Sequence, residues 1–322
     1  MASHANTVFE QLAVDETGPS EFISRYLPVK MVNVANIAYG GCALGVAISA
    51  AYQTVHPKHH LYSALGTYLG PARTDRKLIA TIKTIRETRT FATREVQISQ
   101  KQEGSQPDRL CLIAILDFQT NEPASLLSYS PAPLKLYKIA QDLPTPQQAN
   151  QDLFVTGKIS KDQLDGRTRD SALMHKFFDI RNSPEGVMAQ NLGGAAQIPT
   201  TQDGLAITDK TSGEHYRLKD GVPSQANHSA ALGFMMDASL AFVPMAHSSL
   251  PMEMASACSS LEFALRVFVS DIDLNNWHFR ELFTIAGGAG RTYSESRLWN
   301  NDSTLVASMT QQSILRPAAT KL

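Results

Sequence analysis

One carboxylate stands in the middle of an otherwise apolar, helix-like run. Asp237 lies within residues 232–243, which read Leu-Gly-Phe-Met-Met-Asp-Ala-Ser-Leu-Ala-Phe-Val. Burying an unpaired carboxylate costs free energy, so this side chain needs hydrogen-bond partners or a function. Gly233 precedes it by one helical turn and leaves space above the carboxylate for a water molecule or a substrate carbonyl. Asp237 is therefore a candidate general base, and the alternative is a structural carboxylate satisfied by the backbone or by an arginine.

Two further segments accompany this run. They are residues 257–263, Ala-Cys-Ser-Ser-Leu-Glu-Phe, and residues 305–316, Leu-Val-Ala-Ser-Met-Thr-Gln-Gln-Ser-Ile-Leu-Arg. With residues 228–237 they resemble the Asp, Ser/Thr and Gln segments of the acyl-CoA thioesterase II family. The family's order also covers three N-terminal stretches, residues 39–45, 62–71 and 89–94. The resemblance thus spans most of the chain, and the middle third is its weakest part.

The resemblance implies that Asp237, Ser260 and Gln311 are the catalytic residues. By itself Ser260 is an ordinary small residue of a strand, and only the alignment with the family's Ser/Thr position selects it. Gln311 is followed by Gln312, and neighbours on a strand face opposite sides, so the register decides which amide points inward. We favour Gln311 because residues 305–308 precede it at the family's spacing.

Hydrolysis of a thioester needs a positioned water, a base and hydrogen-bond donors for the developing oxyanion. In the implied arrangement Asp237 takes the proton of the water or orients it, while Ser260 and Gln311 fix its line of attack. Backbone N–H groups at a helix start suit the oxyanion, and the candidates are Gly40-Gly41 and Asn227-His228. We therefore expect Gly40, Gly41 and His228 to bind substrate, although His228 also reads as a structural residue.

The chain departs from the bacterial family pattern at three points. Where the bacterial pattern has Gly-Gly-Gln, residues 40–42 of this chain are Gly-Gly-Cys. In place of Ser-Leu-Asp-His, residues 260–263 are Ser-Leu-Glu-Phe, and in place of Gln-Glu-Gly, residues 311–313 are Gln-Gln-Ser. These departures leave the three catalytic candidates in place and resemble fungal versions of the family. They bear on substrate preference and on contacts in a homo-oligomer.

The sequence also carries an internal duplication. Residues 43–45 and 231–233 both read Ala-Leu-Gly, and residues 112–116 and 305–309 are similar strand-like runs, at a distance of roughly 190 to 200 residues. On these pairings Asp237 corresponds to Ser49, Gln311 to Phe118 and Ser260 to Ala64. The N-terminal copy is then a catalytically empty partner that completes the core and the pocket.

The sequence of the first copy indicates a buried helix followed by strands. Residues 41–54 are rich in alanine and leucine and end before His56-Pro57. Residues 77–85 and 91–99 alternate and contain many β-branched side chains, which is typical of strands. A helix wrapped by an antiparallel sheet is the hotdog arrangement, and the resemblance implies an α+β fold with two hotdogs in tandem.

The predicted division has three parts. Residues 1–129 form the N-terminal hotdog unit, residues 130–168 a Pro/Gln-rich connector, and residues 169–322 the C-terminal unit with the catalytic residues. An alternating run at residues 175–181 marks the first strand of the second unit. Residues 200–204 and 209–214 are expected to be surface turns, as is the glycine cluster at residues 287–290.

Composition excludes several classes of function. The chain has 322 residues, 43% of them apolar, and a net charge of −1 without a basic stripe, so nucleic acid is an unexpected partner. No apolar run reaches a membrane span, and the N-terminus lacks a secretory pattern. Three scattered cysteines suit free thiols in a reducing compartment. The histidines lack metal-ligand spacing, so no metal site is expected. The resemblance to the thioesterase family implies a reaction without a metal or an organic cofactor.

The last three residues, Thr320-Lys321-Leu322, differ from the peroxisomal address Ser-Lys-Leu at the first position. We therefore expect a peroxisomal location with an import receptor as a partner, or otherwise a cytoplasmic one. The function expected from the resemblance is hydrolysis of fatty or related acyl-CoA. The alternative is a repurposed hotdog protein of a secondary-metabolite pathway, which binds, dehydrates or cyclises an acyl or polyketide group without hydrolysis. Dehydration would require a His-x-x-x-x-Asp-x-Asn-Pro-x-His stretch, which the chain lacks.

Overall fold

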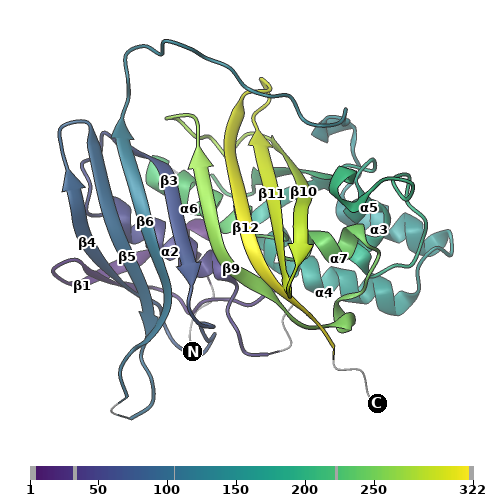
Figure 1. Ribbon diagram of the computed structural model, residues 1–322, viewed down its shortest axis with the longest axis horizontal. Coiled ribbons are helices and arrows are strands. Elements are labelled where there is room, and N and C mark those ends of the chain that lie inside the picture. Colours follow the sequence, from purple (N-terminus) through teal and green to yellow (C-terminus); the bar gives the residue numbers. More distant parts are fainter. Residues whose placement is uncertain (1–4, 32–34, 105, 222–223, 319–322) are drawn as a thin grey trace. The chain divides into compact units, whose positions relative to one another are not determined.

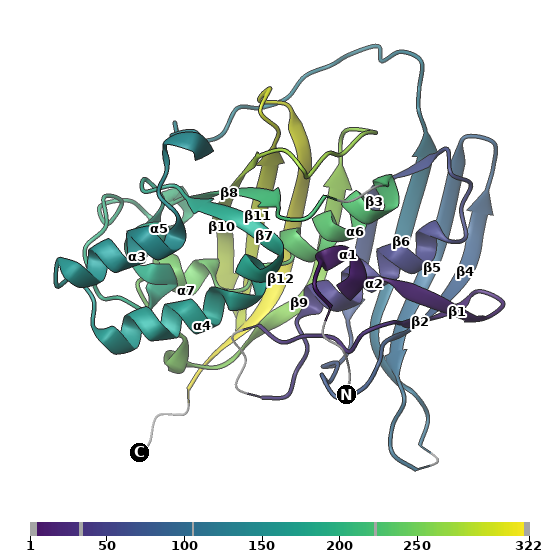
Figure 2. The ribbon, with the colours of Figure 1, turned by 180° about the vertical axis from the view of Figure 1, so that it is seen from behind.

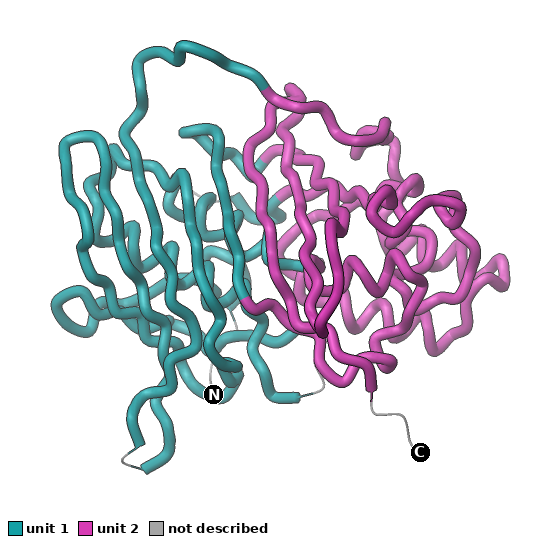
Figure 3. Tube along the Cα trace, viewed as in Figure 1, with its two compact units in different colours: residues 1–129, 218–238, 262–275 teal, residues 130–217, 239–261, 276–322 magenta. Residues whose placement is uncertain are grey.

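The computed structural model describes residues 5–31, 35–104, 106–221 and 224–318. The chain divides into two compact units, which Figure 3 distinguishes by colour. Unit 1 comprises residues 1–129, 218–238 and 262–275, and unit 2 comprises residues 130–217, 239–261 and 276–322. The chain therefore passes between the units several times, and strand β9 (Ala255–Val267) contributes residues to both.

The elements follow one order twice (Figure 1). The helices are α1 (Val8–Gln11), α2 (Gly40–Tyr52), α3 (Pro146–Val155), α4 (Lys161–Phe177), α5 (Val187–Gln190), α6 (Gln225–Met236) and α7 (Val243–His247). The strands of the first copy are β1 (Val14–Gly18), β2 (Glu21–Ser24), β3 (His59–Tyr68), β4 (Ile79–Glu87), β5 (Phe91–Gln100) and β6 (Arg109–Thr120). Those of the second copy are β7 (Phe178–Asn182), β8 (Ser212–Leu218), β9, β10 (His278–Gly288), β11 (Arg291–Trp299) and β12 (Leu305–Pro317). Each copy thus has two strands, a long apolar helix (α2 or α6) and four strands, which confirms the predicted duplication.

In unit 1 the strands run in the order β1, β2, β4, β5, β6, β3, and β3 also pairs with the second half of β9. Helix α2 lies across β4, β5 and β6 (Figure 2) and packs against α6. Nearly every residue of α2 is buried, as its alanine-rich and leucine-rich sequence predicts. Gly41 permits the close crossing of the two helices, since a Cβ at this residue would lie 2.7 Å from the carbonyl oxygen of Phe234.

In unit 2 the strands run in the order β9, β12, β11, β10, β8, β7, and α7 lies over β10 and β11. Ala289 and Gly290, with φ of 51° and 72°, form the turn between β10 and β11, so the glycine cluster is a turn as predicted. The segment before α3 is held to the sheet by hydrogen bonds. The indole N–H of Trp299 donates to the carbonyl of Pro131 at 2.8 Å, and the Leu134 N–H donates to the Glu281 carboxylate.

Three predicted segments differ from the structure. The strand expected at residues 175–181 starts only at Phe178, because residues 175–177 form the end of α4. The proposed connector at residues 130–168 contains α3 and the start of α4, and both helices begin with capping boxes, Thr145 with Gln148 and Ser160 with Gln163. The Thr-Pro-Gln-Gln and Ser-Lys-Asp-Gln patterns were therefore the available signals for these helices. The expected surface turn at residues 209–214 was wrong in its second half, because β8 starts at the buried Ser212.

Candidate functional site

Asp237 caps the C-terminus of α6 rather than standing in the middle of a helix. Helix α6 ends at Met236, and Ser239 adopts a left-handed φ of 72° before the chain continues to α7. The carboxylate is still buried, with 6% of the residue exposed. The Tyr68 hydroxyl donates a hydrogen bond to Oδ1 at 3.1 Å. The carboxylate thus has a fixed position at a helix end.

Gly233 has a different role from the predicted one. A Cβ at this residue would lie 2.5 Å from Ile48 Cδ1 and 3.2 Å from Leu44 Cγ. The room that the glycine provides is therefore occupied by side chains of α2, and it allows α2 and α6 to approach closely. It does not provide a space for water or substrate above Asp237.

The first residues of α2 lie beside the carboxylate. A Cβ at Gly40 would be 2.9 Å from Asp237 Oδ2 and 3.1 Å from the Tyr68 hydroxyl oxygen. The N-cap Tyr39 makes no side-chain capping bond, and the N–H groups of a first helical turn have no acceptor inside the helix. Partial positive charge therefore collects beside Asp237, where α2 begins at Gly40.

Two protonated groups surround Asp237 within unit 1. Burial raises the pKa of Tyr68 well above its ordinary value, and the charge of Asp237 raises it further. Burial also raises the pKa of the Cys42 thiol to about 12, with a smaller contribution from Asp237. At neutral pH the phenol is a hydrogen-bond donor and the thiol is not a nucleophile.

Tyr68 is a site residue that the sequence reasoning missed. It closes the stretch 62–71 that supports the family resemblance, but nothing in that stretch indicates a contact with Asp237. Tyr68 and Gly40 both belong to the first copy of the duplication. The first copy therefore contributes contacts to the candidate base, in addition to the core.

His228 lies at the other end of α6. Its Nδ1 accepts a hydrogen bond from the Leu274 N–H at 3.3 Å, and its Nε2 is 3.9 Å from Asp273 Oδ1. Burial lowers its pKa, although Asp273 and Asp271 act in the opposite direction. Nine residues separate it from Asp237, roughly 13 Å along a helix. The structure therefore brings Gly40 to Asp237, with Gly41 next to it in α2, and leaves His228 in a structural contact.

Ser260 and Gln311 form a hydrogen-bonded pair in unit 2. The Ser260 hydroxyl on β9 donates to Gln311 Oε1 on β12 at 3.0 Å. Gln311 is 1% exposed and points to the buried face of β12, whereas Gln312 points to the other face and is half-buried. A buried amide on a strand can orient a polar ligand through its N–H and carbonyl groups.

The strand registers correct one predicted equivalence. A β-bulge lies between Thr84 and Arg86 in β4 and between Thr284 and Ala286 in β10, so these strands align at a distance of 200 residues. Thr84 pairs with Arg94, and Thr284 pairs with Ser294, so these two partners are also equivalent.

Across the next pair of strands, Arg94 pairs with Leu116, and Ser294 pairs with Gln311. Gln311 therefore corresponds to Leu116 and not to Phe118. Ala64 pairs with Leu116 just as Ser260 contacts Gln311, which agrees with the predicted match of Ser260 to Ala64.

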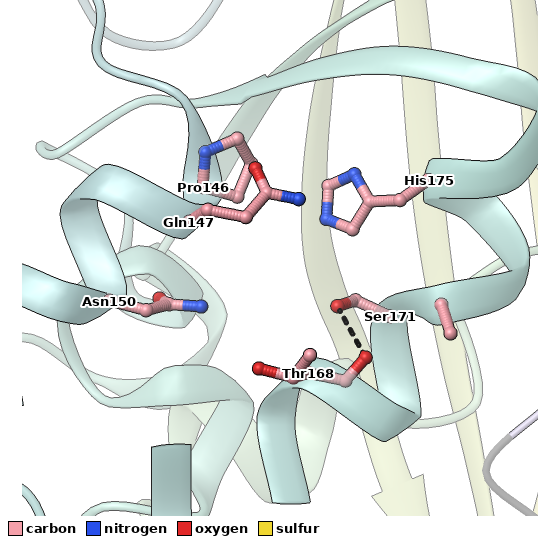
Figure 4. A pocket seen from close by; sticks show the side chains of 7 residues that line it. Pro146, Gln147, Asn150, Thr168, Ser171 and His175 are labelled. Carbon is pink, nitrogen blue, oxygen red and sulfur yellow. Dashed lines mark hydrogen bonds between the residues drawn. The ribbon is translucent and has the colours of Figure 1, made fainter. Parts of the chain in front are cut away.

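A small hollow lies elsewhere in unit 2, between α3 and α4 (Figure 4). Its polar lining includes Asn150, Thr168, Ser171 and His175, and Figure 4 shows the His175 and Asn150 side chains directed into it. None of the predicted site residues lines this hollow.

The described part of the chain shows neither a metal-binding cluster nor a membrane-spanning helix. Residues 5–31, 35–104, 106–221 and 224–318 contain no group of three or more acidic, histidine or cysteine side chains arranged to hold a metal ion. Within the same ranges no helix is long and apolar enough to cross a membrane. The predicted address Thr320-Lys321-Leu322 lies outside the described residues.

Comparison with known proteins gives a consistent result. Residues 27–119 match the family model of the acyl-CoA thioesterase N-terminal domain, and residues 179–315 match that of the C-terminal domain. Among curated proteins none matches.

Solved structures share the fold over nearly the whole chain. An acyl-CoA thioesterase II, TesB2, from Mycobacterium marinum is similar with a TM-score of 0.67 and 18% identity, covering 97% of this chain and 99% of that one. A tesB protein from Mycobacterium avium subs paratuberculosis gives 0.68 and 15%, covering 96% and 98%. A hot dog fold protein of unknown function from Alicyclobacillus acidocaldarius gives 0.64 and 14%, covering 98% and 100%. These likenesses confirm the predicted double hotdog.

Proposed function

The chain belongs to the acyl-CoA thioesterase family and is a thioester hydrolase, and from this premise we propose that Asp237, Ser260 and Gln311 direct water onto a fatty or related acyl-CoA. The observation that carries the proposal is the position of Asp237. Its buried carboxylate lies where the uncapped N-terminus of α2 begins, and Tyr68 holds one of its oxygens. A base and a set of oxyanion donors thus meet at one point of unit 1.

In the proposed reaction Asp237 accepts a proton from water while the water oxygen forms a bond to the thioester carbonyl carbon. The N–H groups of Gly40 and Gly41 donate to the carbonyl oxygen as it gains negative charge. The carbon–sulfur bond then breaks, and the proton passes to the coenzyme A thiolate as the acid is released. The hydrogen-bonded pair Ser260 and Gln311 orients the water.

The chain carries no Gly-x-Ser-x-Gly motif, so the proposal involves no acyl-serine intermediate. Cys42 and Cys258 are also unsuited to attack, because burial raises the pKa of each thiol to about 12. Water is therefore the nucleophile in the proposed mechanism, and free acid appears in a single chemical stage without a burst.

Release of coenzyme A from a panel of acyl-CoAs tests the proposal. Asp237→Asn should lower kcat by roughly 10²- to 10⁴-fold, because asparagine has a similar size and shape but cannot act as a general base. Gln311→Ala should also lower kcat, while Gln312→Ala, on the opposite face of the same strand, is the matched control. If Asp237 and Gln311 act on the same water, the double variant should lose little more than the worse single variant.

Two results would contradict the assignment. Turnover that survives Asp237→Asn in a folded protein would remove Asp237 from the mechanism. A wild type that releases no coenzyme A from any thioester would favour the non-hydrolytic alternative, an acyl or polyketide-binding protein of a secondary-metabolite pathway.

We also propose three features outside the catalytic set. The hotdog units extend over residues 1–129 and 169–322 with the connector at residues 130–168, a division supported by the change of unit at residue 130.

The protein associates with itself, which light scattering of the purified chain tests. Thr320-Lys321-Leu322 directs it to peroxisomes through the import receptor, so a fluorescent fusion should lose a punctate distribution when these three residues are removed.

A further inference from the structure

The buried face of the sheet around Gln311 is lined by hydroxyl groups. Gln311 pairs directly with Ser294, and Ser313, the next residue of β12 on the same face, pairs with Thr292. Residues that pair directly across antiparallel strands point to the same face. The hydroxyl side chains on this face are Thr284 on β10, Thr292, Ser294 and Ser296 on β11, and Ser313 on β12, and all five residues are buried.

Two of these hydroxyls have partners within the sheet. Ser294 donates to Thr284 Oγ1 at 3.3 Å, and Thr284 donates to the carbonyl of Tyr293 at 3.2 Å. They need no ligand.

The other three have none. In the described part of the chain, Thr292 Oγ1, Ser296 Oγ and Ser313 Oγ are buried without a hydrogen-bond partner. Ser296 and Ser313 are 0% and 1% exposed. Buried polar groups in native proteins are nearly always satisfied, so three unpaired hydroxyls on one face indicate a polar ligand.

The equivalent face of the first copy shows that the fold does not require these hydroxyls. The registers match Thr292 to Ala92, Ser296 to Val96 and Ser313 to Phe118. All three first-copy residues are 0% exposed. The same backbone thus packs well with apolar side chains, and a site for a saturated chain would be expected to keep them.

We infer that this face binds an acyl group that carries oxygen substituents, such as hydroxyl or oxo groups, near its thioester. The inference rests on the proposed function, because it takes Gln311 to lie at the reacting carbonyl. Ser313 is two residues from Gln311, roughly 7 Å along the strand, and neighbouring strands are about 4.8 Å apart. The hydroxyls therefore reach the first few carbons of the acyl group and not the end of a long chain.

The test compares matched substrates. Coenzyme A release is measured for 3-hydroxyacyl-CoA, 3-oxoacyl-CoA and unsubstituted acyl-CoA of one chain length, on wild type, Ser296→Ala and Ser313→Ala. Ser308→Ala, on the opposite face of β12, is the matched control. We expect wild type to favour an oxygenated substrate in kcat/KM by about tenfold or more, since a site built for hydrogen bonds rejects an analogue that lacks them.

Ser313→Ala or Ser296→Ala should bring this ratio toward one, while Ser308→Ala leaves it unchanged. A wild type that prefers the unsubstituted chain would overturn the inference. So would variants that slow both substrates alike, because the hydroxyls would then bind the shared pantetheine arm. Thioesters of N-acetylcysteamine, which lack most of that arm, identify this case, since the Ser313→Ala defect would disappear with them.

Binding separates a failure of the inference from a failure of the proposed function. If wild type releases no coenzyme A from any thioester, calorimetry still compares the affinity for an oxygenated acyl-CoA with that for the unsubstituted acyl-CoA of the same length. Tighter binding of the oxygenated member, by about tenfold, that Ser313→Ala abolishes would support the polar site without hydrolysis. Equal binding of the two members would overturn it.

Discussion

The two copies of the duplicated unit use one backbone for different purposes. Both carry a β-bulge at the same position of the equivalent strands β4 and β10, so their inner faces can be compared residue by residue. The first copy presents Ala92, Arg94, Val96, Leu116 and Phe118, where the second presents Thr292, Ser294, Ser296, Gln311 and Ser313. One face is a packed core, and the other is polar and holds the candidate Gln311.

Arg94 makes the difference plain. This buried arginine donates to the carbonyls of Thr54 and Arg86 at 2.7 and 3.1 Å and pairs with Glu87. Its other N–H groups donate to Thr54 Oγ1 and the Thr93 carbonyl, so the side chain joins the segment after α2 to the sheet. A serine at the equivalent position, Ser294, makes one hydrogen bond within the sheet. Duplication thus lets one copy keep a packed face while the other, within the described residues, carries unpaired buried hydroxyls on the equivalent strands.

The largest expected effect comes from exchanging the equivalent residues Leu116 and Gln311. Leu116→Gln buries an amide among apolar side chains and should lower the free energy of unfolding by roughly 3 to 5 kcal/mol, through lost transfer energy and an unpaired polar group. Gln311→Leu should leave the protein as stable as wild type while kcat falls by about 10²-fold or more. Urea unfolding and coenzyme A release measure the two effects. Equal losses of stability in both variants would break the comparison.

Substitution of Arg94 should have the next largest effect. Arg94→Met removes a buried cation that donates to two partly buried carbonyls and leaves Glu87 without its partner, so we expect a loss of about 3 kcal/mol in unfolding free energy. Ser294→Ala at the equivalent position should change it by less than about 1 kcal/mol, since one neutral hydrogen bond is lost. Similar unfolding midpoints for the two variants would mean that the arginine is not the element that stabilises the first copy.

The sequence predicted the duplicated architecture because apolar helices and alternating strands are local patterns. Helix α2 was expected at residues 41–54 and extends over residues 40–52. The end of α6 was not predictable, since neither glycine nor proline follows Asp237 and the turn uses Ser239 in a left-handed conformation. The match of Gln311 to Phe118 failed because the bulges that set the register leave no signal in the sequence. Tyr68 was missed because its contact with Asp237 joins residues 169 apart.

The third prediction concerns this contact between the copies. Tyr68→Phe removes the hydrogen bond to Asp237 and should lower kcat/KM by about tenfold, the worth of one hydrogen bond to a charged group. A hydrogen bond to a carboxylate favours its ionised form, so the acid limb of the pH–rate profile should move to higher pH. Cys42 in unit 1 also interacts electrostatically with Asp237, and its thiol stays protonated in this range.

Tyr62→Phe, on the same strand, is the matched control for Tyr68→Phe and should leave the profile unchanged. If Tyr68→Phe lowers the rate but leaves the acid limb in place, the phenol supports packing and does not act on Asp237. In that case Tyr68 would belong to the core of the first copy, and this copy would act at Asp237 only through the start of α2 at Gly40.

The smallest expected effect lies on the outer faces of the two copies. The registers match Glu281 on β10 to Thr81 on β4. Thr81 is exposed, whereas Glu281 is fully buried and accepts hydrogen bonds from the Leu134 N–H and the Tyr137 hydroxyl at 2.9 Å. Burial raises the pKa of Glu281, and these hydrogen bonds offset only part of the shift.

Because its pKa is higher in the folded state, Glu281 binds a proton in the folded protein before the unfolded chain does as the pH falls. The stability of wild type relative to Glu281→Gln should therefore increase from neutral pH toward the ordinary glutamate pKa and then level off. Urea unfolding of both proteins at several pH values measures this difference, with the exposed Glu253→Gln as control. A difference that stays constant would mean that the hydrogen bonds from residues 134–137 fully offset the effect of burial on the pKa of Glu281.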